Sequence, residues 1–244
     1  MDEKLIDDRY PEDQRAPEDR RVPWTIGDVI LALVSFLILV TLGTAVISRV
    51  LANELPKVGQ ILALFIGYVI LFLLIGFFAL RRGANLQMLG FRPFNFLRGA
   101  GMVVAWFFLV KLASAIYTLV AQRLGINPSE EAVRRLPEIF GRSTGGFLLA
   151  VLVVAVVAPV AEELFFRGFV YPAFRQRWGV TAAIIITSVL FALFHFSPSV
   201  FIPIFIIAVG LAYLYQVTDS LGPPIMLHAL NNFLSVVVIY YSSL

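Results

Sequence analysis

Six polar side chains lie in three otherwise apolar segments of the sequence. They are Glu162, Glu163, Arg167, His195, His228 and Asn232. Polar groups persist in such surroundings when they are paired, face a cavity or carry a function. Carboxylate and imidazole groups can take a proton from water, and nearby donors can stabilise an oxyanion. We therefore expect these residues to hydrolyse a peptide bond.

The first of the three segments contains two adjacent glutamates. Arg167 follows Glu163 by four residues, one helical turn, so the two side chains can pair. Glu162 lies about 100° around the helix from Glu163. One arginine cannot fully neutralise two carboxylates, so we expect one carboxylate to remain available. The alternative is a buried ion pair that only fixes helix packing.

The two histidines of the chain both fall in apolar segments. Asn232 follows His228 by four residues and shares its helical face. The alternative interpretation for a buried histidine is a packing residue with its hydrogen bonds satisfied. His228 follows Gly222 by only six residues. In a simple seven-span arrangement, His228 therefore lies nearer the membrane surface than the glutamates.

His195 is predicted to face Glu162. The fourth and fifth apolar segments should form an antiparallel hairpin that turns near Trp178 and Gly179. Glu162 precedes Gly179 by seventeen residues and His195 follows it by sixteen. At 1.5 Å per residue, both lie roughly 25 Å from the turn, at the same depth.

The composition indicates that the six polar residues belong to a membrane protein. Of 244 residues, 59% are hydrophobic and 14% are charged, whereas soluble domains have about a quarter charged. Unpaired backbone groups cannot face lipid, so long apolar runs must be helices. These runs cover about 24–50, 58–80, 97–122, 144–172, 180–197, 199–217 and 223–242. We predict an all-α, polytopic transmembrane helix bundle of about seven spans, with eight as the alternative.

The chain divides into three parts. Residues 1–22 are highly charged and predict a disordered N-terminal tail. Residues 23–143 hold N-terminal transmembrane helices and an amphipathic loop, 123–143, which is an interfacial helix broken near Pro137 or a lid. Residues 144–244 form the catalytic transmembrane core. Eleven lysines and arginines fall on the N-terminal side and six on the other, which predicts a cytoplasmic N-terminus in the cell (plasma or inner) membrane.

Some classes of site are excluded. The chain has no cysteine, which rules out disulfides, thiolate metal sites and cysteine nucleophiles. The net charge of +3 comes without a basic patch interleaved with aromatic residues, so we expect no nucleic-acid partner. Lys111 lies within the third apolar segment, where it snorkels or faces the bundle.

The polar residues also match the motifs of a known family. The motifs are Glu162-Glu163-x-x-x-Arg167, Phe191-x-x-x-His195 and His228-Ala-x-x-Asn232. In order and spacing they resemble the CAAX prenyl protease and bacteriocin-processing (CPBP, Abi) family of intramembrane glutamic proteases. The resemblance extends over about residues 145–242 and implies a multi-helix intramembrane protease with a site open toward the cytosol.

The resemblance also implies a role for each residue. Glu162 and His195 would activate the water, and Glu163 and Arg167 would hold Glu162 in place. The substrate would be a membrane-associated peptide or protein. It could carry a prenylated CAAX-type C-terminus, be a bacteriocin-type leader, or be another membrane peptide.

The resemblance further implies that His228 and Asn232 stabilise the oxyanion. We expect no cofactor and a metal-independent reaction. The alternative is a zinc hydrolase with Glu162, His195 and His228 as ligands. The two histidines are thirty-three residues apart, unlike the pair on one helix in His-Glu-x-x-His.

Two further alternatives are not enzymes. Buried Glu, Arg and His also mark ion pathways in transporters, although those often have internal repeats, which this sequence lacks. An immunity or scaffolding protein could use the same polar residues to bind a partner without cutting it.

Overall fold

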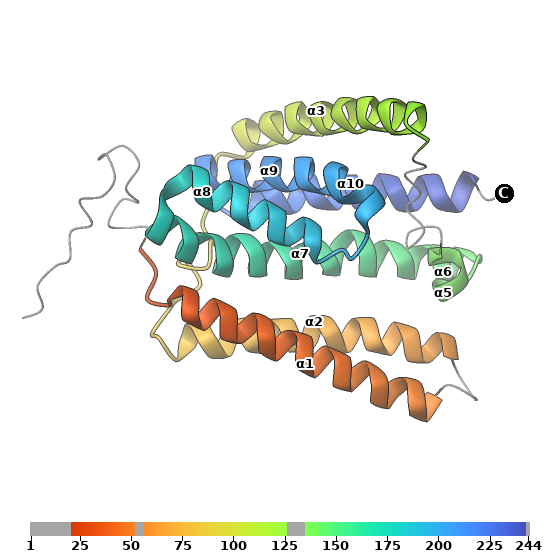
Figure 1. Cartoon of the computed structure of the whole chain (residues 1–244), viewed down its shortest axis with the longest axis horizontal. Helices are drawn as coiled ribbons and strands as arrows, with labels where there is room; N and C mark the ends of the chain where they lie inside the picture. Colours follow the sequence, from red (N-terminus) through yellow and green to blue (C-terminus); the bar gives the residue numbers. More distant parts are fainter. Residues whose placement is uncertain (1–20, 52–55, 126–134, 243–244) are drawn as a thin grey trace, which may run out of the picture.

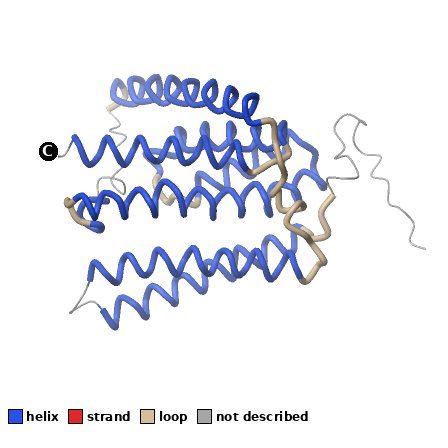
Figure 2. Tube along the Cα trace, turned by 180° about the vertical axis from the view of Figure 1, so that it is seen from behind, coloured by secondary structure: helices blue, strands red, loops and turns tan. Residues whose placement is uncertain are grey.

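The structure is a computed structural model that describes residues 21–51, 56–125 and 135–242. Within these ranges every regular element is a helix (Figure 2). Six helical runs are long and apolar enough to cross a membrane. They are Ile26–Leu51, Lys57–Leu80, Phe96–Arg123, Thr144–Leu193, Pro198–Thr218 and Gly222–Tyr241. The chain is an all-α, multi-pass integral membrane protein, as predicted.

The helices follow one another with short connections. In chain order they are α1 (Ile26–Leu51), α2 (Pro56–Leu80), α3 (Phe96–Arg123), α5 (Leu136–Phe140), α6 (Thr144–Ala150), η3 (Val151–Val157), α7 (Ala158–Glu163), η4 (Leu164–Val170), α8 (Tyr171–Leu193), η5 (Pro198–Val200), α9 (Phe201–Thr218) and α10 (Gly222–Ser242). In Figure 1 they form layers, with α3 on one side, α9 and α10 next to it, then the run from α6 to α8, and the α1–α2 pair on the other side.

The seven predicted apolar segments are all helical but occupy six runs. The fourth and fifth segments follow each other without a separate loop, and the helix is interrupted between them at Gly179. Gly179 has φ 79° and ψ 175°, a backbone conformation that favours glycine, and the chain reverses direction there (Figure 1). The turn predicted near Trp178 and Gly179 is therefore present.

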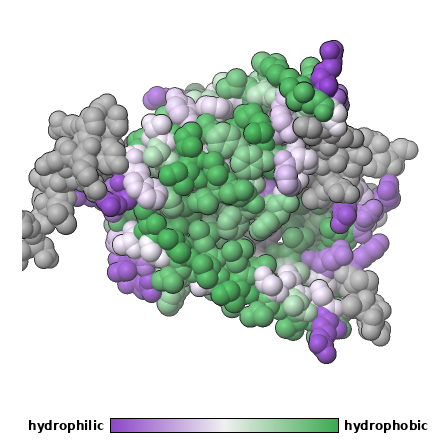
Figure 3. Space-filling view, in the orientation of Figure 1, coloured by the Kyte–Doolittle hydropathy of each residue, from purple (hydrophilic) through white to green (hydrophobic). Residues whose placement is uncertain are grey.

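The outer surface is apolar in a band between two polar ends (Figure 3). Leu42, Leu73, Leu119 and Val238 are among its exposed large side chains. In water this exposure would be unfavourable, whereas in a bilayer these side chains contact lipid tails. The apolar band on the surface therefore agrees with the membrane-spanning segments predicted from the sequence.

Two predicted segments are only partly described. Of the tail 1–22, Arg21 and Val22 lie within the described residues, and the Val22 N–H donates to the Gln176 side chain at 3.0 Å. Of the loop 123–143, residues 126–134 lie outside the described ranges. Pro137 lies in the first turn of α5.

The hairpin of α8 and α9 turns inside the bundle. The Tyr117 hydroxyl donates to the Ser199 carbonyl at 2.9 Å. Tyr117 precedes the end of α3 at Arg123 by six residues, roughly 9 Å along the helix. The turn, which begins just after His195, therefore lies short of the end of α3.

The α1–α2 pair is fixed to the remaining helices near one end. The Trp24 indole N–H donates to the Phe169 carbonyl at 2.7 Å, and the two rings stack at 5.4 Å. Asp28 at the start of α1 pairs with Arg81 and Arg82 at the end of α2. Toward the other end, α1 slopes away from the α6–α7 run (Figure 1), whereas Ile61 of α2 packs against the apolar cluster that contains Leu136 and Phe140 of α5.

Candidate active site

The helix that carries both glutamates is irregular on either side of them. α7 lies between two π-helical stretches, η3 and η4, in which hydrogen bonds reach one residue further back than in an α-helix. The Ala158 N–H, for example, donates to the Val153 carbonyl five residues earlier. Turns of this kind are rare in proteins, and those that do occur are often at functional sites. The irregular helix therefore marks this region as the candidate site.

Glu163 and Arg167 form a fully buried ion pair. Arg167 Nη1 donates to Glu163 Oε1 at 3.0 Å, and both side chains have no exposed surface. Arg167 Nη2 donates to the Ala208 carbonyl of α9 at 3.0 Å. The guanidinium lies 4.6 Å from the ring centre of Phe191. Arg167 is therefore paired with Glu163, and its contacts link α7, η4, α8 and α9.

His228 joins this pair from α10. Its Nδ1 lies 2.8 Å from Glu163 Oε1, close enough for a hydrogen bond. Since a carboxylate only accepts, Nδ1 is the protonated nitrogen and donates to Glu163. The other ring nitrogen, Nε2, then faces Glu162, with 3.9 Å to its Oε2. His228 therefore stands between the two carboxylates.

Glu162 differs sharply from its neighbour. Its side chain is 23% exposed, whereas that of Glu163 is fully buried. It makes no hydrogen bond to the described part of the chain, and it lines a cavity. One carboxylate is therefore committed to the buried pair, and the other is available.

The depth of His228 follows from a loop between α2 and α3. The Gly90 carbonyl accepts a hydrogen bond from the Leu221 N–H at 2.9 Å. A Cβ atom on Gly168 would meet the neighbouring Leu89 carbonyl at 2.6 Å, so Gly168 lies at the same level as Leu221. Glu163 precedes Gly168 by five residues and His228 follows Leu221 by seven, roughly 8 and 10 Å. The helix of Glu163 continues beyond the start of α10, which brings His228 level with it.

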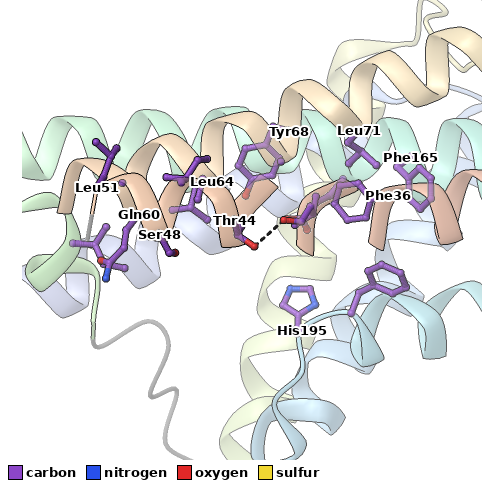
Figure 4. Close-up of a pocket in the computed structure, with 18 of the residues that line it drawn as sticks. Phe36, Thr44, Ser48, Leu51, Gln60, Leu64, Tyr68, Leu71, Phe165 and His195 are labelled. Atoms are coloured by element: carbon purple, nitrogen blue, oxygen red, sulfur yellow. Dashed lines mark hydrogen bonds between the residues drawn. The ribbon is translucent and has the colours of Figure 1, made fainter. Parts of the chain in front are cut away.

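His195 lines the same cavity as Glu162 (Figure 4). Its Nδ1 lies 2.8 Å from the Phe191 carbonyl. A carbonyl only accepts, so Nδ1 carries the proton of the neutral ring and Nε2 is an acceptor. The Phe191 ring contacts both histidine rings, with centroid distances of 4.9 Å to His195 and 5.6 Å to His228.

Asn232 contacts the irregular helix instead of Glu162. Its Nδ2 donates to the Val154 carbonyl at 3.0 Å. In the π-helical register this carbonyl would accept from residue 159, but Pro159 has no N–H. The Asn232 amide supplies the missing donor, and its second N–H is left for another partner.

Two residues outside the predicted set belong to this network. Lys111 Nζ on α3 donates to Asn231 Oδ1 at 2.8 Å, and Asn231 Nδ2 lies 3.4 Å from Asn232 Oδ1. Lys111 faces the bundle, one of the two orientations expected from the sequence. A lysine within an apolar segment predicts that a polar partner lies nearby in the fold. The sequence does not identify that partner, because Asn231 lies 120 residues away.

A cavity of about 730 Å³ separates the α1–α2 pair from the helices that carry Glu162 and His195. Most of its lining is apolar, including Phe36, Leu64, Leu71, Phe165 and Phe194. The polar side chains in its lining are Thr44, Ser48, Gln60, Tyr68, Glu162 and His195. The arrangement suits an elongated apolar ligand with one polar group next to Glu162.

The described residues contain no group of three His, Asp or Glu side chains arranged to hold a metal ion. The zinc ligands considered from the sequence, Glu162, His195 and His228, all lie within the described residues.

Comparisons with known proteins agree with the motifs. Residues 144–234 match the family described as type II CAAX prenyl endopeptidase Rce1-like. The chain is also 29% identical over 164 residues to the UPF0177 protein YbdI of Lactococcus lactis subsp. lactis (strain IL1403). That alignment covers 63% of this chain and 87% of the relative. No solved structure matches. The resemblance to the CAAX protease group is thereby confirmed for the segment that holds all six residues.

Proposed function

We propose that the chain hydrolyses a peptide bond of a membrane-associated substrate, with Glu162 as the base, because residues 144–234 match the family described as type II CAAX prenyl endopeptidase Rce1-like. One observation carries the proposal: of two adjacent glutamates, Glu163 is fully buried in an ion pair, whereas Glu162 is 23% exposed and lines the cavity with His195. A buried pair that served packing alone would not need the second carboxylate.

The chemistry follows from the two groups. A water molecule beside Glu162 gives a proton to the carboxylate while its oxygen attacks the scissile carbonyl carbon. His195 Nε2 accepts a hydrogen bond from the same water, because its Nδ1 donates to the Phe191 carbonyl. When the tetrahedral intermediate collapses, the C–N bond breaks and the proton passes from Glu162 to the leaving nitrogen. The products are a carboxylic acid and an amine.

His228 and Asn232 are proposed to stabilise the oxyanion. For this role His228 must donate from Nε2 while Nδ1 donates to Glu163, so the ring is an imidazolium. Asn232 contributes the N–H that Val154 does not use. Donors that are fixed before reaction are effective in a low-dielectric site.

The substrate is proposed to be a peptide with a long apolar portion. The cavity of about 730 Å³ is lined mainly by apolar side chains from both the α1–α2 pair and the core. A lipidated, CAAX-type prenylated C-terminus fits this lining and the matched family description. An unlipidated leader or other membrane peptide is the competing class.

The test is cleavage in liposomes of two internally quenched peptides of one sequence, with and without a farnesyl group on cysteine. We expect Glu162→Gln and His195→Ala to lower kcat by about 10²–10⁴-fold, the usual contribution of general acid–base groups. Glu138→Gln is the matched control, because Glu138 is an exposed glutamate outside the cavity. Cleavage at the wild-type rate by a folded Glu162→Gln variant would contradict the proposal.

Metal independence is also a proposal. Cleavage should survive dialysis against 1,10-phenanthroline and should not rise when zinc is added back. Loss of cleavage that zinc restores would contradict it and would favour the set Glu162, His195 and His228 as ligands.

We further propose that the N-terminus faces the cytosol. Arg81, Arg82, Arg92 and Arg175 lie in or beside the connections at the end of the bundle that holds the start of α1, in line with the positive-inside rule. The cysteine-free chain allows single-cysteine variants to report sidedness directly. In intact cells, Gly83→Cys should resist an impermeant maleimide and Arg142→Cys should react. The reverse pattern would overturn the orientation.

A further inference from the structure

The wall of the cavity opposite the core offers one tyrosine hydroxyl. Tyr68 on α2 lines the cavity together with Glu162 and His195. In Figure 4 its hydroxyl points into the cavity, and His195 approaches from the other side. Its ring packs against two apolar clusters of the bundle, which fixes the direction of the hydroxyl. Within the described ranges this hydroxyl makes no hydrogen bond to the protein.

The other polar groups on that wall are less suitable donors. The Thr44 hydroxyl already donates within its own helix, at 2.8 Å from the Val40 carbonyl and 3.0 Å from the Thr41 carbonyl. Gln60 precedes Tyr68 by eight residues on α2, roughly 12 Å along the helix. Tyr68, unlike Thr44, has a hydroxyl with no partner in the described residues, and it lines the cavity that Glu162 also lines.

The contacts of the core wall leave room for a further donor. His228 and Asn232 are not among the residues that line the cavity, and each already has one N–H held, by Glu163 and by the Val154 carbonyl respectively. A water that attacks from the Glu162 side approaches one face of the scissile carbonyl. The carbonyl oxygen of a peptide that spans the cavity can then be reached from the α2 wall, where Tyr68 presents its hydroxyl.

We propose that Tyr68 is a further catalytic residue, whose hydroxyl donates a hydrogen bond to the scissile carbonyl oxygen as it becomes an oxyanion. The inference rests on the proposed peptide hydrolysis. No bond to Tyr68 forms or breaks: the hydrogen bond strengthens as negative charge develops on the oxygen and weakens when the intermediate collapses. Interactions that are stronger in the transition state than in the ground state raise kcat.

The first test compares Tyr68→Phe with wild type on the quenched farnesylated peptide in liposomes. The variant keeps the ring and removes only the hydroxyl. We expect kcat to fall by about 10²–10³-fold, the usual effect of losing one oxyanion donor, with KM within about twofold. Tyr240→Phe is the matched control, since its hydroxyl donates to the Gly141 carbonyl at 3.1 Å and does not line the cavity. It should retain wild-type kcat.

The second test does not depend on turnover. A farnesylated peptide with a phosphonate in place of the scissile amide imitates the tetrahedral oxyanion. Tyr68→Phe should bind this analogue about 10²-fold more weakly than wild type, whereas binding of the uncleaved amide peptide, measured in the Glu162→Gln background, should not change. A residue that only supports the fold would affect both ligands alike.

The outcomes separate this inference from the proposed function. If Glu162→Gln cuts as fast as wild type, the proposed hydrolysis itself fails. If Glu162→Gln is inactive but Tyr68→Phe keeps wild-type kcat and analogue affinity, the role of Tyr68 is wrong and the hydrolysis stands. A change in KM alone would make Tyr68 a substrate-binding side chain and would overturn the catalytic role.

Discussion

The two walls of the cavity are held in different ways. On the core wall, Glu163 and Arg167 are paired with no exposed surface. On the α1–α2 wall, the ion pairs join Asp28 to Arg81 and Arg82 at one end, where the arginine side chains are 37% and 44% exposed. Only 6% of the residues in the most apolar stretch of α1 and 17% of those in α2 are buried, against 39% in Thr144–Leu193, the run that carries Glu162. The core therefore fixes the geometry of the catalytic groups, while the α1–α2 pair completes the cavity and is less firmly attached.

The largest effect should come from breaking the buried pair. Arg167→Met leaves the Glu163 carboxylate buried without its partner, which typically costs about 3–5 kcal/mol. Arg81→Met removes one partner of the buried Asp28, which keeps Arg82 and Thr25, and should cost less, about 1.5–3 kcal/mol. The free energy of unfolding of each variant can be measured in dodecylmaltoside micelles titrated with dodecyl sulfate. Equal losses in the two variants would contradict the contrast between the walls.

A smaller effect should follow from loosening the attachment of α1. Trp24→Phe keeps an aromatic ring against Phe169 but removes the indole N–H that donates to the Phe169 carbonyl at 2.7 Å. We expect a loss of about 1–2 kcal/mol, because a partly buried carbonyl loses its donor.

The same variant should widen the distance between the two walls. Spin labels at Val46→Cys on α1 and Ile185→Cys on α8, both exposed positions, report that distance by double electron–electron resonance. A second pair within the core, Ile185→Cys and Leu230→Cys, serves as the control. The first distribution should broaden in Trp24→Phe and the second should not. Broadening of both would mean that Trp24 supports the whole bundle.

The Asn232 contact should have an effect of about 1 kcal/mol. Asn232→Ala leaves the Val154 carbonyl without a donor, because Pro159 cannot supply one. Interhelical hydrogen bonds in membranes average about 0.6 and reach about 1.7 kcal/mol. In a Pro159→Ala background the new N–H can donate to Val154, so Asn232→Ala should cost clearly less. An unchanged cost in the double-mutant cycle would show that the amide matters for another reason.

Much of the site could be predicted from the sequence. Glu162, Glu163 and Arg167 stand out because charged groups are rare in apolar helices, and spacing of one helical turn predicts the Glu163–Arg167 contact. The turn at Gly179 predicted that Glu162 and His195 reach the same depth, and both line one cavity. These features depend on the spacing of residues along the chain, which can be read directly from the sequence.

Other features depend on how distant segments pack. The position of His228 beside Glu163 requires the helix of Glu163 to extend past the start of α10, which the loop at Gly90 determines. The link between Asn232 and Val154 requires a π-helical register, and no residue pattern specified it. Tyr68 is a single tyrosine in an apolar helix, so only the cavity distinguishes it from a packing residue.

The smallest effect should come from Lys111, at the far side of the core from the α1–α2 pair. Its ammonium donates to Asn231, which links through a longer contact of 3.4 Å to Asn232. Lys111→Met keeps the length and apolar stem of the side chain and removes the charge and the donor. We expect a loss of about 0.6 kcal/mol, the average for interhelical hydrogen bonds in a membrane. Cleavage of the quenched peptide should stay within about twofold, because the catalytic groups keep their own contacts. A tenfold loss of kcat without loss of stability would show that the network beginning at Lys111 positions Asn232 for catalysis, and that the firmly held core wall extends to α3.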